Sequence, residues 1–345
     1  MVRKTKNSGW AHALGRAVGA VARTTLRSST SALTGALKTV RKSREAPLGA
    51  GDWIAGVAMG PAGMRRYRLY KPPDVATTER LPLLVMLHGC GQDANTFARS
   101  TRMNRVAARE RFLVLYPEQD RSANPQGCWN WFSTKTGQAY GEASLIMAAI
   151  DQVCLLYPVD PARVGLAGLS AGASMAALLA TRHPERFRAI AMHSGVAPGA
   201  ADSTLSALGA MQGLHEPSVP FTPHAAPWPP LLVVHGGSDR VVAASNGQSA
   251  ALLWAEAAGA SAGASRPLQR GKRHPAVVTD YRVRGRTAAT YCEIGRLGHA
   301  WSGGDAREAH SDAEGPDASR LVWSFMARQL RRTAGKRASR AKAAA

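Results

Sequence analysis

The sequence predicts an α/β fold with a doubly wound, mostly parallel sheet. Short apolar runs typical of buried strands recur along the chain, and segments with the apolar spacing of helices lie between them. Alternation of this kind specifies a parallel sheet with right-handed crossovers. The 345 residues, of which 45% are hydrophobic and 19% charged, suffice for one body with a large core.

The expected elements follow in chain order. Met64–Tyr70 should form a strand of an edge hairpin that ends at Lys71-Pro72-Pro73. The buried strands are then expected at Leu83–Leu87, Phe112–Tyr116, Val164–Ala167, Ala189–Met192 and Leu231–His235. Helical spacing marks Phe97–Arg109, Glu142–Leu156 and Ala171–Arg182.

The last third of the chain departs from this rhythm. Gly195–Pro230 is rich in Pro, Ala and Gly and predicts a long loop or a small cap over the sheet edge. Val277–Val283 and Thr287–Glu293 flank Gly285 and should be the last strands. Asp317–Leu330 is expected as the closing helix.

Charge is concentrated at the two ends. The net charge is +21, and sixteen of the 44 Lys and Arg residues lie before Glu45 or from Arg331 onward, where no acidic residue occurs. We therefore expect a basic, flexible arm at residues 1–60, a main folded domain at 61–330 and a basic tail at 331–345. The tails could contact an anionic surface, a granule or nucleic acid, and they equally fit disordered segments.

Targeting and membrane signals are weak. No run of about 18 apolar residues is present, so no transmembrane segment is expected. Arg16, Arg23 and Arg27 interrupt the stretch where the apolar region of a signal peptide would lie. A cytoplasmic location is therefore open on this evidence.

The motif Gly168-Leu169-Ser170-Ala171-Gly172 lies between a predicted strand and a predicted helix. A sharp strand-to-helix turn needs small residues around it, and it raises the serine hydroxyl above the sheet edge. Ser170 is therefore the candidate nucleophile. The alternative is a packing turn of small residues.

A serine nucleophile needs a base, which a carboxylate orients, and in this arrangement the chain order is serine, acid, histidine. His299 follows the last predicted strand and has small neighbours, so it is the candidate base. Asp239 lies in the loop after the strand Leu231–His235 and is the candidate acid. Its alternative role is the N-cap of the helix that contains Leu252–Glu256.

Two backbone amides are candidates for an oxyanion hole. Ala171 follows the nucleophile, and Cys90 lies in the Gly-rich loop after the strand Leu83–Leu87. A purely structural tight turn is the alternative for this loop. Cys128 also lies in a polar loop near the expected site, so a bridge between Cys90 and Cys128 is plausible, but the spacing alone leaves it open. The four cysteines match no metal site, and we expect no metal.

Seven short segments together resemble the polyhydroxybutyrate (polyhydroxyalkanoate) depolymerase-like esterases, with their feruloyl and acetylxylan esterase relatives. The segments are Leu87–Gln92, Thr101–Asn104, Tyr116–Gln119, Cys128–Phe132, Asp160–Val164, the Ser170 turn and Gly298–Gly304. The resemblance covers about Arg65 to Leu330. It implies the α/β-hydrolase fold, with Ser170, Asp239 and His299 as triad of an acyl-enzyme mechanism that uses no cofactor.

The resemblance also implies a polyester or short-acyl ester substrate and an extracellular location. Trp129, Trp131 and Trp301 would then line an apolar groove at the active edge, with packing in the core as the alternative. Two other functions are possible from the sequence. One is a serine peptidase on the same fold, and the other is a binding protein that acts through its basic tails.

Overall fold

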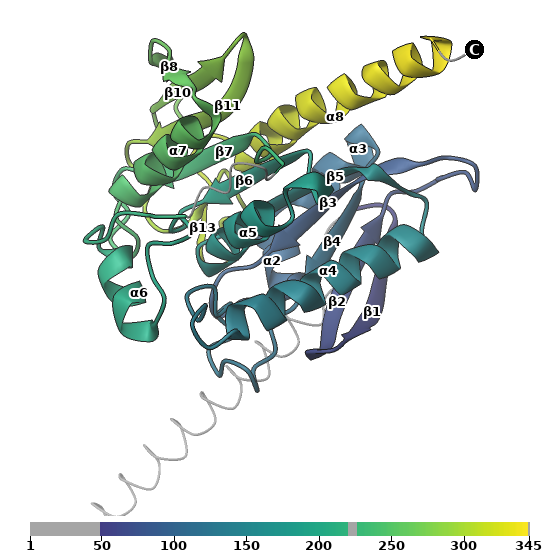
Figure 1. Ribbon diagram of the computed structural model, residues 1–345, viewed down its shortest axis with the longest axis horizontal. Coiled ribbons are helices and arrows are strands. Elements are labelled where there is room, and N and C mark those ends of the chain that lie inside the picture. The colour runs from purple at the N-terminus through teal and green to yellow at the C-terminus, as the bar shows by residue number, and fades with distance from the viewer. Residues whose placement is uncertain (1–48, 220–225, 344–345) are drawn as a thin grey trace, which may run out of the picture. The chain divides into compact units, whose positions relative to one another are not determined.

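A central sheet organises the structure, a computed structural model that describes residues 49–219 and 226–343 (Figure 1). Within these residues eleven strands pair in one sheet. They are β1 (Asp52–Gly60), β2 (Gly63–Lys71), β3 (Leu81–Leu87), β4 (Leu113–Pro117), β5 (Val159–Leu169), β6 (Ala189–His193), β7 (Leu231–Gly236), β8 (Ser261–Ala262), β9 (Arg266–Leu268), β10 (Ala276–Val283) and β11 (Arg286–Ile294).

The strand order is β1-β2-β4-β3-β5-β6-β7-β11-β10-β8, and β9 also pairs with β10. The six strands from β4 to β11 in this order run parallel to one another. The pairs at the two ends of the sheet are antiparallel: β1 with β2, β2 with β4, and β10 with its partners. The predicted doubly wound, mostly parallel sheet is therefore confirmed.

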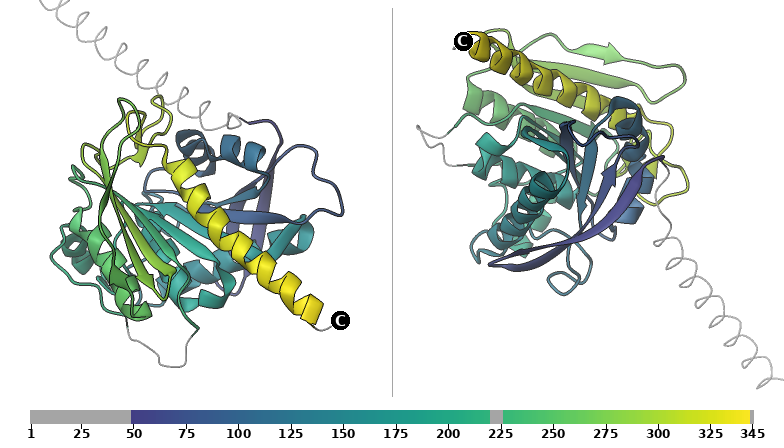
Figure 2. Two further views of the ribbon diagram at one scale, coloured as in Figure 1. Left: turned by 90° about the horizontal axis from the view of Figure 1, so that it is seen from above. Right: turned by 90° about the vertical axis from the view of Figure 1, so that its right-hand side faces the viewer.

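Helices cover both faces of the sheet (Figure 2). They are α2 (Ala94–Thr101), α3 (Met103–Glu110), α4 (Gln138–Leu156), α5 (Ala171–Arg182), α6 (Thr204–Met211), α7 (Ser245–Ala258) and α8 (Ala318–Ala343). Side chains of α4, α5 and α7 form one core cluster, and those of α2, α3 and α8 form the other. Strand β3 joins both clusters, because Leu83 and Val85 point to the first while Leu84 and Met86 point to the second.

The structure differs from the sequence prediction at the two boundaries of the body. The predicted arm of residues 1–60 is too long, because Asp52–Gly60 is strand β1 and pairs with β2 along its whole length. The signal for this hairpin was an apolar residue at every second position, Trp53, Ala55, Val57 and Met59, before the turn at Pro61-Ala62. At the other end, α8 continues past Leu330 to Ala343 through a segment rich in Ala, Lys and Arg, which favour helix.

Two further elements differ in detail. The predicted helix Phe97–Arg109 is divided into α2 and α3, because Arg102 adopts a left-handed conformation (φ 54°) and donates a side-chain hydrogen bond to the carbonyl of Gly303. The segment Gly195–Pro230 contains the short helix α6 and is otherwise without helix or strand in its described residues. The predicted contacts of residues 1–44 and of the side chains after Arg331 lie outside the described part of the chain.

Helix α4 is long and apolar enough, by length and composition, to cross a membrane. Half of it is buried inside the molecule, where Ala143, Ile146 and Ile150 pack in the core. A core helix passes the same test of length and hydropathy, so this helix is weak evidence for a membrane span.

Candidate active site

Ser170 occupies a strained turn between β5 and α5. Its backbone has φ 55° and ψ −123°, which non-glycine residues rarely adopt. The flanking glycines are required by space: a Cβ on Gly168 would lie 2.3 Å from the backbone of Gly172, and a Cβ on Gly172 would lie 2.2 Å from the carbonyl oxygen of Leu87. The amide of Ser170 donates to the carbonyl of His193 on the neighbouring strand (2.9 Å), which holds the turn at the sheet edge.

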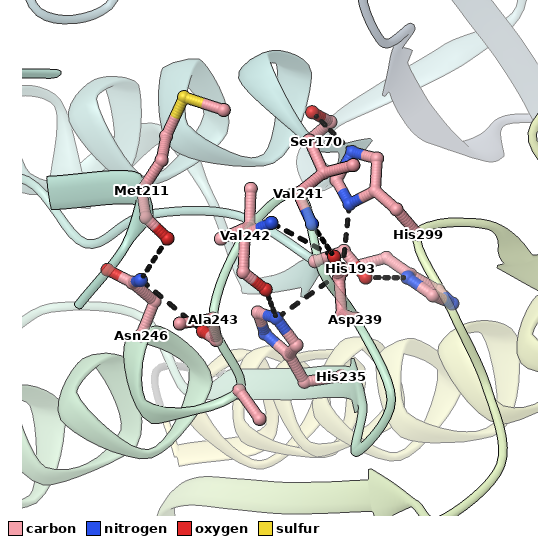
Figure 3. Close-up of polar contacts among 12 residues, drawn as sticks. Ser170, His193, Met211, His235, Asp239, Val241, Val242, Ala243, Asn246 and His299 are labelled. Carbon is pink, nitrogen blue, oxygen red and sulfur yellow. Dashed lines mark hydrogen bonds and ion pairs between the residues drawn. The ribbon is translucent and has the colours of Figure 1, made fainter. Parts of the chain in front are cut away.

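The structure brings Ser170, His299 and Asp239 together at the carboxyl edge of the sheet (Figure 3). His299 Nε2 lies 2.9 Å from Ser170 Oγ, and His299 Nδ1 lies 2.8 Å from Asp239 Oδ2. Since a carboxylate only accepts hydrogen bonds, the Nδ1 proton belongs to this contact, and neutral Nε2 is left to accept from the serine hydroxyl. In sequence, His299 is 129 positions from Ser170 and 60 positions from Asp239.

Asp239 is held by more than the histidine. Its Oδ1 atom accepts hydrogen bonds from the amides of Val241 and Val242, each at 2.9 Å. Burial by itself raises the pKa of Asp239, but the hydrogen bonds from His299 and the two amides outweigh it, so the pKa lies below its usual value. The carboxylate stays charged at neutral pH. Helix α7 begins at Ser245 with Ala244 as its N-cap, so Asp239 is not the N-cap of that helix.

The Gly-rich loop after β3 lies beside this turn. The amides of Cys90 and Ala171 donate no hydrogen bond within the described part of the chain, so both remain available to an external acceptor. A disulfide joins Cys90 to Cys128 (S–S 2.08 Å), while Cys154 and Cys292 are free. The loop is thereby tied covalently to the segment around Trp129.

A buried polar network that the sequence does not indicate lies behind this loop. Glu142 on α4 accepts from the amide of Asn130 (2.9 Å) and from the side chain of Gln119 (2.6 Å). Arg65 on β2 donates to Gln119 Oε1 (2.6 Å), and His88 Nε2 accepts from the Gln119 amide (3.1 Å). No local motif marks these residues, because they come from different elements and meet only in the fold.

The prediction that tryptophans line a groove is wrong for Trp129 and Trp301. Trp129 is 0% exposed and donates to the carbonyl of His88, and Trp301 is 1% exposed and donates to Ser319 Oγ. Each indole N–H therefore has a partner inside the core, as buried indoles require. Trp131 is 7% exposed and packs edge-on against Phe132, so little of its surface is open to a ligand.

Two buried histidines lie beside Asp239 and the segment that follows His299. His235 Nε2 lies 3.0 Å from the carbonyl of Val242 and 3.6 Å from Asp239 Oδ2. His193 stacks on Trp301, and its Nε2 accepts from the amide of Ser302, three residues after His299. Burial lowers the pKa of His193 to about 3, and burial also lowers that of His235. Both are neutral at pH 7 and therefore do not compete with His299 for the negative charge of Asp239.

Metal ligation has no candidate in the described ranges 49–219 and 226–343. No group of three or more His, Cys, Asp or Glu side chains there could hold a metal ion. What the site does contain is a hydroxyl, an imidazole and a carboxylate in hydrogen-bonded series beside two free amides. Such a set can perform nucleophilic acyl transfer.

A family model described as Esterase PHB depolymerase matches residues 65–274, more than half of the chain. The chain belongs to this family. The match begins on β2 and includes the Ser170 turn and Asp239, while His299 lies beyond its end. The resemblance inferred from seven segments is thus confirmed at the level of the family.

Relatives and solved structures agree with this membership. The chain is 34% identical over 193 residues to poly(3-hydroxyalkanoate) depolymerase C of Paucimonas lemoignei, and this match covers 52% of the chain and 45% of the depolymerase. It is 34% identical over 150 residues to feruloyl esterase B of Neurospora crassa, covering 42% and 49%. The chain thus spans about half the length of these relatives. An acetyl xylan esterase from Aspergillus awamori has the same fold (TM-score 0.59, 19% identity, covering 72% of this chain and 94% of that one).

Proposed function

We propose that this chain is a serine hydrolase that cleaves carboxylic esters through an acyl-enzyme. One observation carries the proposal: the imidazole of His299 lies 2.9 Å from the hydroxyl of Ser170 and 2.8 Å from the buried carboxylate of Asp239. These are the distances needed for proton transfer without rearrangement.

The residues divide the reaction between them. His299 Nε2 takes the proton as Ser170 Oγ attacks the ester carbonyl, and the charged Asp239 stabilises the resulting imidazolium. The amides of Cys90 and Ala171 would donate to the oxyanion, each contributing a few kcal/mol. His299 then returns its proton to the leaving alkoxide. A water activated by the same imidazole releases the acid and restores the serine.

The substrate we propose is a polyhydroxyalkanoate or a short hydroxyacyl ester; feruloyl or acetylxylan esters are the alternative. The similarity to a poly(3-hydroxyalkanoate) depolymerase supports the first choice. So does an apolar surface beside the site: Val241 is exposed next to Asp239, and the exposed Leu205 and Leu208 lie on α6. Helix α6 abuts the Asp239 loop, since the amide of Ala243 donates to the carbonyl of Met211 (2.8 Å). An apolar polymer would gain from this surface.

The first test removes the nucleophile. Ser170→Ala should reduce hydrolysis of p-nitrophenyl butyrate at least 10³-fold while circular dichroism and thermal unfolding stay unchanged, because the rest of the site persists. Ser144→Ala is the matched control, since Ser144 is exposed on α4 and bonds only its own helix. Full activity in Ser170→Ala would end the proposal.

A substrate panel separates the alternatives. Hydroxybutyrate oligomers should be cleaved with a higher kcat/KM than methyl ferulate or acetylated xylan. A preference for the aromatic or sugar esters would favour the alternative. Turnover of peptides without turnover of any ester would favour the serine peptidase function.

We propose an extracellular location on the evidence of the Cys90–Cys128 disulfide, because such bridges persist in oxidising compartments. Alkylation of the protein in freshly opened cells and in the medium tests this. Two reactive thiols, those of Cys154 and Cys292, are expected in the extracellular protein after denaturation. Four thiols there, or retention of all the protein in the cytoplasm, would contradict it.

For the basic tails we infer contact with a polyanionic surface. The acid-free composition of residues 1–44 and 331–345 supports this. Deleting residues 1–44 should weaken binding to anionic vesicles or nucleic acid and reduce its dependence on salt. An unchanged affinity and salt dependence would reject the inference.

A further inference from the structure

A cavity of about 500 Å³ lies on the face of the sheet that α8 covers. Its walls are α3, the first turns of α8 and the loop before β10; α3 and α8 lie side by side (Figure 1). None of the proposed triad residues lines it. Of its described lining residues, six are arginines and one is an acid, Asp317; the arginines are Arg102, Arg105, Arg109, Arg270, Arg273 and Arg320.

The arginines come from opposite walls. Arg102 is the N-cap of α3, and Arg105 and Arg109 follow it at spacings of three and four positions. The three therefore lie on one side of the helix. Arg270 and Arg273 lie across the cavity in the loop before β10. An anion between the walls could therefore be contacted from both sides.

The protein itself compensates only part of this charge. Arg320 pairs with Asp317 at 3.4 Å, and Arg109 pairs with the exposed Glu110 at 2.8 Å. Arg102 donates to the backbone carbonyl of Gly303. Arg273 donates to the backbone carbonyls of Ala313 and Gly315. A carbonyl satisfies a donor but carries no net charge, so the positive charge of both side chains remains.

Arg105 and Arg270 have no side-chain acceptor at all within residues 49–219 and 226–343. Guanidinium groups gathered around one cavity repel each other. An anion between these side chains would reduce the repulsion.

The chemistry of the walls selects the kind of anion. Every cationic lining side chain is an arginine, whose planar fork matches the oxygens of a phosphate in a two-bond contact. The described lining contains no aromatic side chain on which a nucleobase could stack. The volume lies within the range of sites for small ligands.

We propose that this arginine pocket binds a small anion that carries two or more phosphate groups. Such a ligand would place one phosphate near Arg105 and another near Arg270. Two residues that line the pocket contact the segment after His299: Arg102 donates to the carbonyl of Gly303, and Ser319 accepts from the indole of Trp301. The ligand would therefore lie behind the loop that carries His299. The proposal does not depend on ester hydrolysis.

The test is isothermal titration of the full chain with sodium tripolyphosphate at two salt concentrations. Arg105→Gln with Arg270→Gln should weaken the affinity at least tenfold, because each lost guanidinium removes charge-assisted hydrogen bonds. The matched control is Arg284→Gln with Arg286→Gln, which removes the same charge at the other end of β10, roughly 25 Å from the pocket. It should change the affinity less than twofold. The basic tails are identical in both variants.

Three results would overturn the proposal. They are absence of binding by the unaltered chain, equal weakening in both double variants, and citrate binding as tightly as tripolyphosphate. Thermal unfolding checks that the variants fold. If the double variant does not fold, Arg270→Gln alone can be used, because Arg270 lies in an exposed loop. This single variant should weaken binding at least threefold. A smaller loss would also count against the pocket.

Discussion

Asp239 shows how one side chain meets several requirements of the proposed mechanism. One oxygen contacts His299, and the other accepts two amides of the following turn. These hydrogen bonds lower the pKa of Asp239 in spite of its burial, so its charge is present when His299 becomes an imidazolium. In the proposed mechanism, Asp239 would thus fix both the tautomer and the orientation of His299.

Replacing this charge should cost activity far more than stability. Asp239→Asn should lower kcat for p-nitrophenyl butyrate by about 10⁴-fold, because an amide group directed at Nδ1 favours the wrong tautomer of His299. Stopped-flow or steady-state kinetics at pH 7.5 measures this. Asp280→Asn, at a carboxylate on β10 that pairs with exposed arginines, is the control and should retain full activity. Comparable activity in both variants would show that Asp239 does not orient the base.

The tryptophans show where residue-level prediction fails. The sequence places Trp129 and Trp301 near the expected active edge, and position along the chain alone makes them candidates for a substrate groove. Which way an indole points depends on whether a hydrogen-bond partner lies inside the molecule. The partners here, the carbonyl of His88 and the hydroxyl of Ser319, are distant in sequence.

Among the elements, the close contact of α5 with β3 determines the shape of the turn that holds Ser170. Gly172 in the first turn of α5 lies so close to β3 that a Cβ would be 2.2 Å from the carbonyl of Leu87. Helix and strand can approach this closely only without a side chain. The G-x-S-x-G motif therefore reports on packing between elements as well as on the turn itself.

Gly172→Ala should destabilise the fold by several kcal/mol, since the backbone of β3 or α5 must shift to relieve the overlap. Urea unfolding measures the change. Gly141→Ala in α4 is the matched control: its Cβ would meet Ala62 Cβ at 3.5 Å, an ordinary contact, and alanine favours helix by about 0.5–1 kcal/mol over glycine. We expect the control to be neutral or stabilising. A Gly172→Ala variant as stable as its control would contradict the packing argument.

Helix boundaries were less predictable than the presence of the elements. The apolar spacing from Phe97 to Arg109 is continuous, yet the structure interrupts it at Arg102. The interruption coincides with a hydrogen bond from Arg102 to Gly303, about two hundred residues away. A local pattern carries no information about such a contact.

At the scale of the whole molecule, neutral histidines are buried where the sheet meets its loops. Burial lowers the pKa of His88 to about 4 and that of His193 to about 3. The unfolded chain binds protons at these side chains near pH 6.5, whereas the folded chain does not. Their contribution to stability is therefore full above pH 6.5 and is lost as the pH falls toward 4.

The free energy of unfolding should accordingly fall between pH 6.5 and 4.5, by up to about 1.4 kcal/mol per pH unit for each such histidine. Urea unfolding at stepped pH measures the slope. His88→Gln removes one titrating group, so its slope should be smaller than that of the unaltered chain. The low pKa of Asp239 affects stability only below about pH 4 and does not enter this window. Identical slopes would show that His88 is charged in the folded protein.

Three features could be predicted before the fold was known: the alternation of strands and helices, the serine turn and the chain order of the three proposed catalytic residues. These are local properties: apolar period, small residues around a turn, and a loop position after a strand. Three other features became visible only in the folded molecule: Trp129 and Trp301 are buried, Gln119 joins Arg65 to Glu142 behind the Cys90 loop, and six arginines line one cavity. The physical reason is that burial, hydrogen-bond partners and uncompensated charge depend on residues that are far apart in the chain and adjacent only after folding.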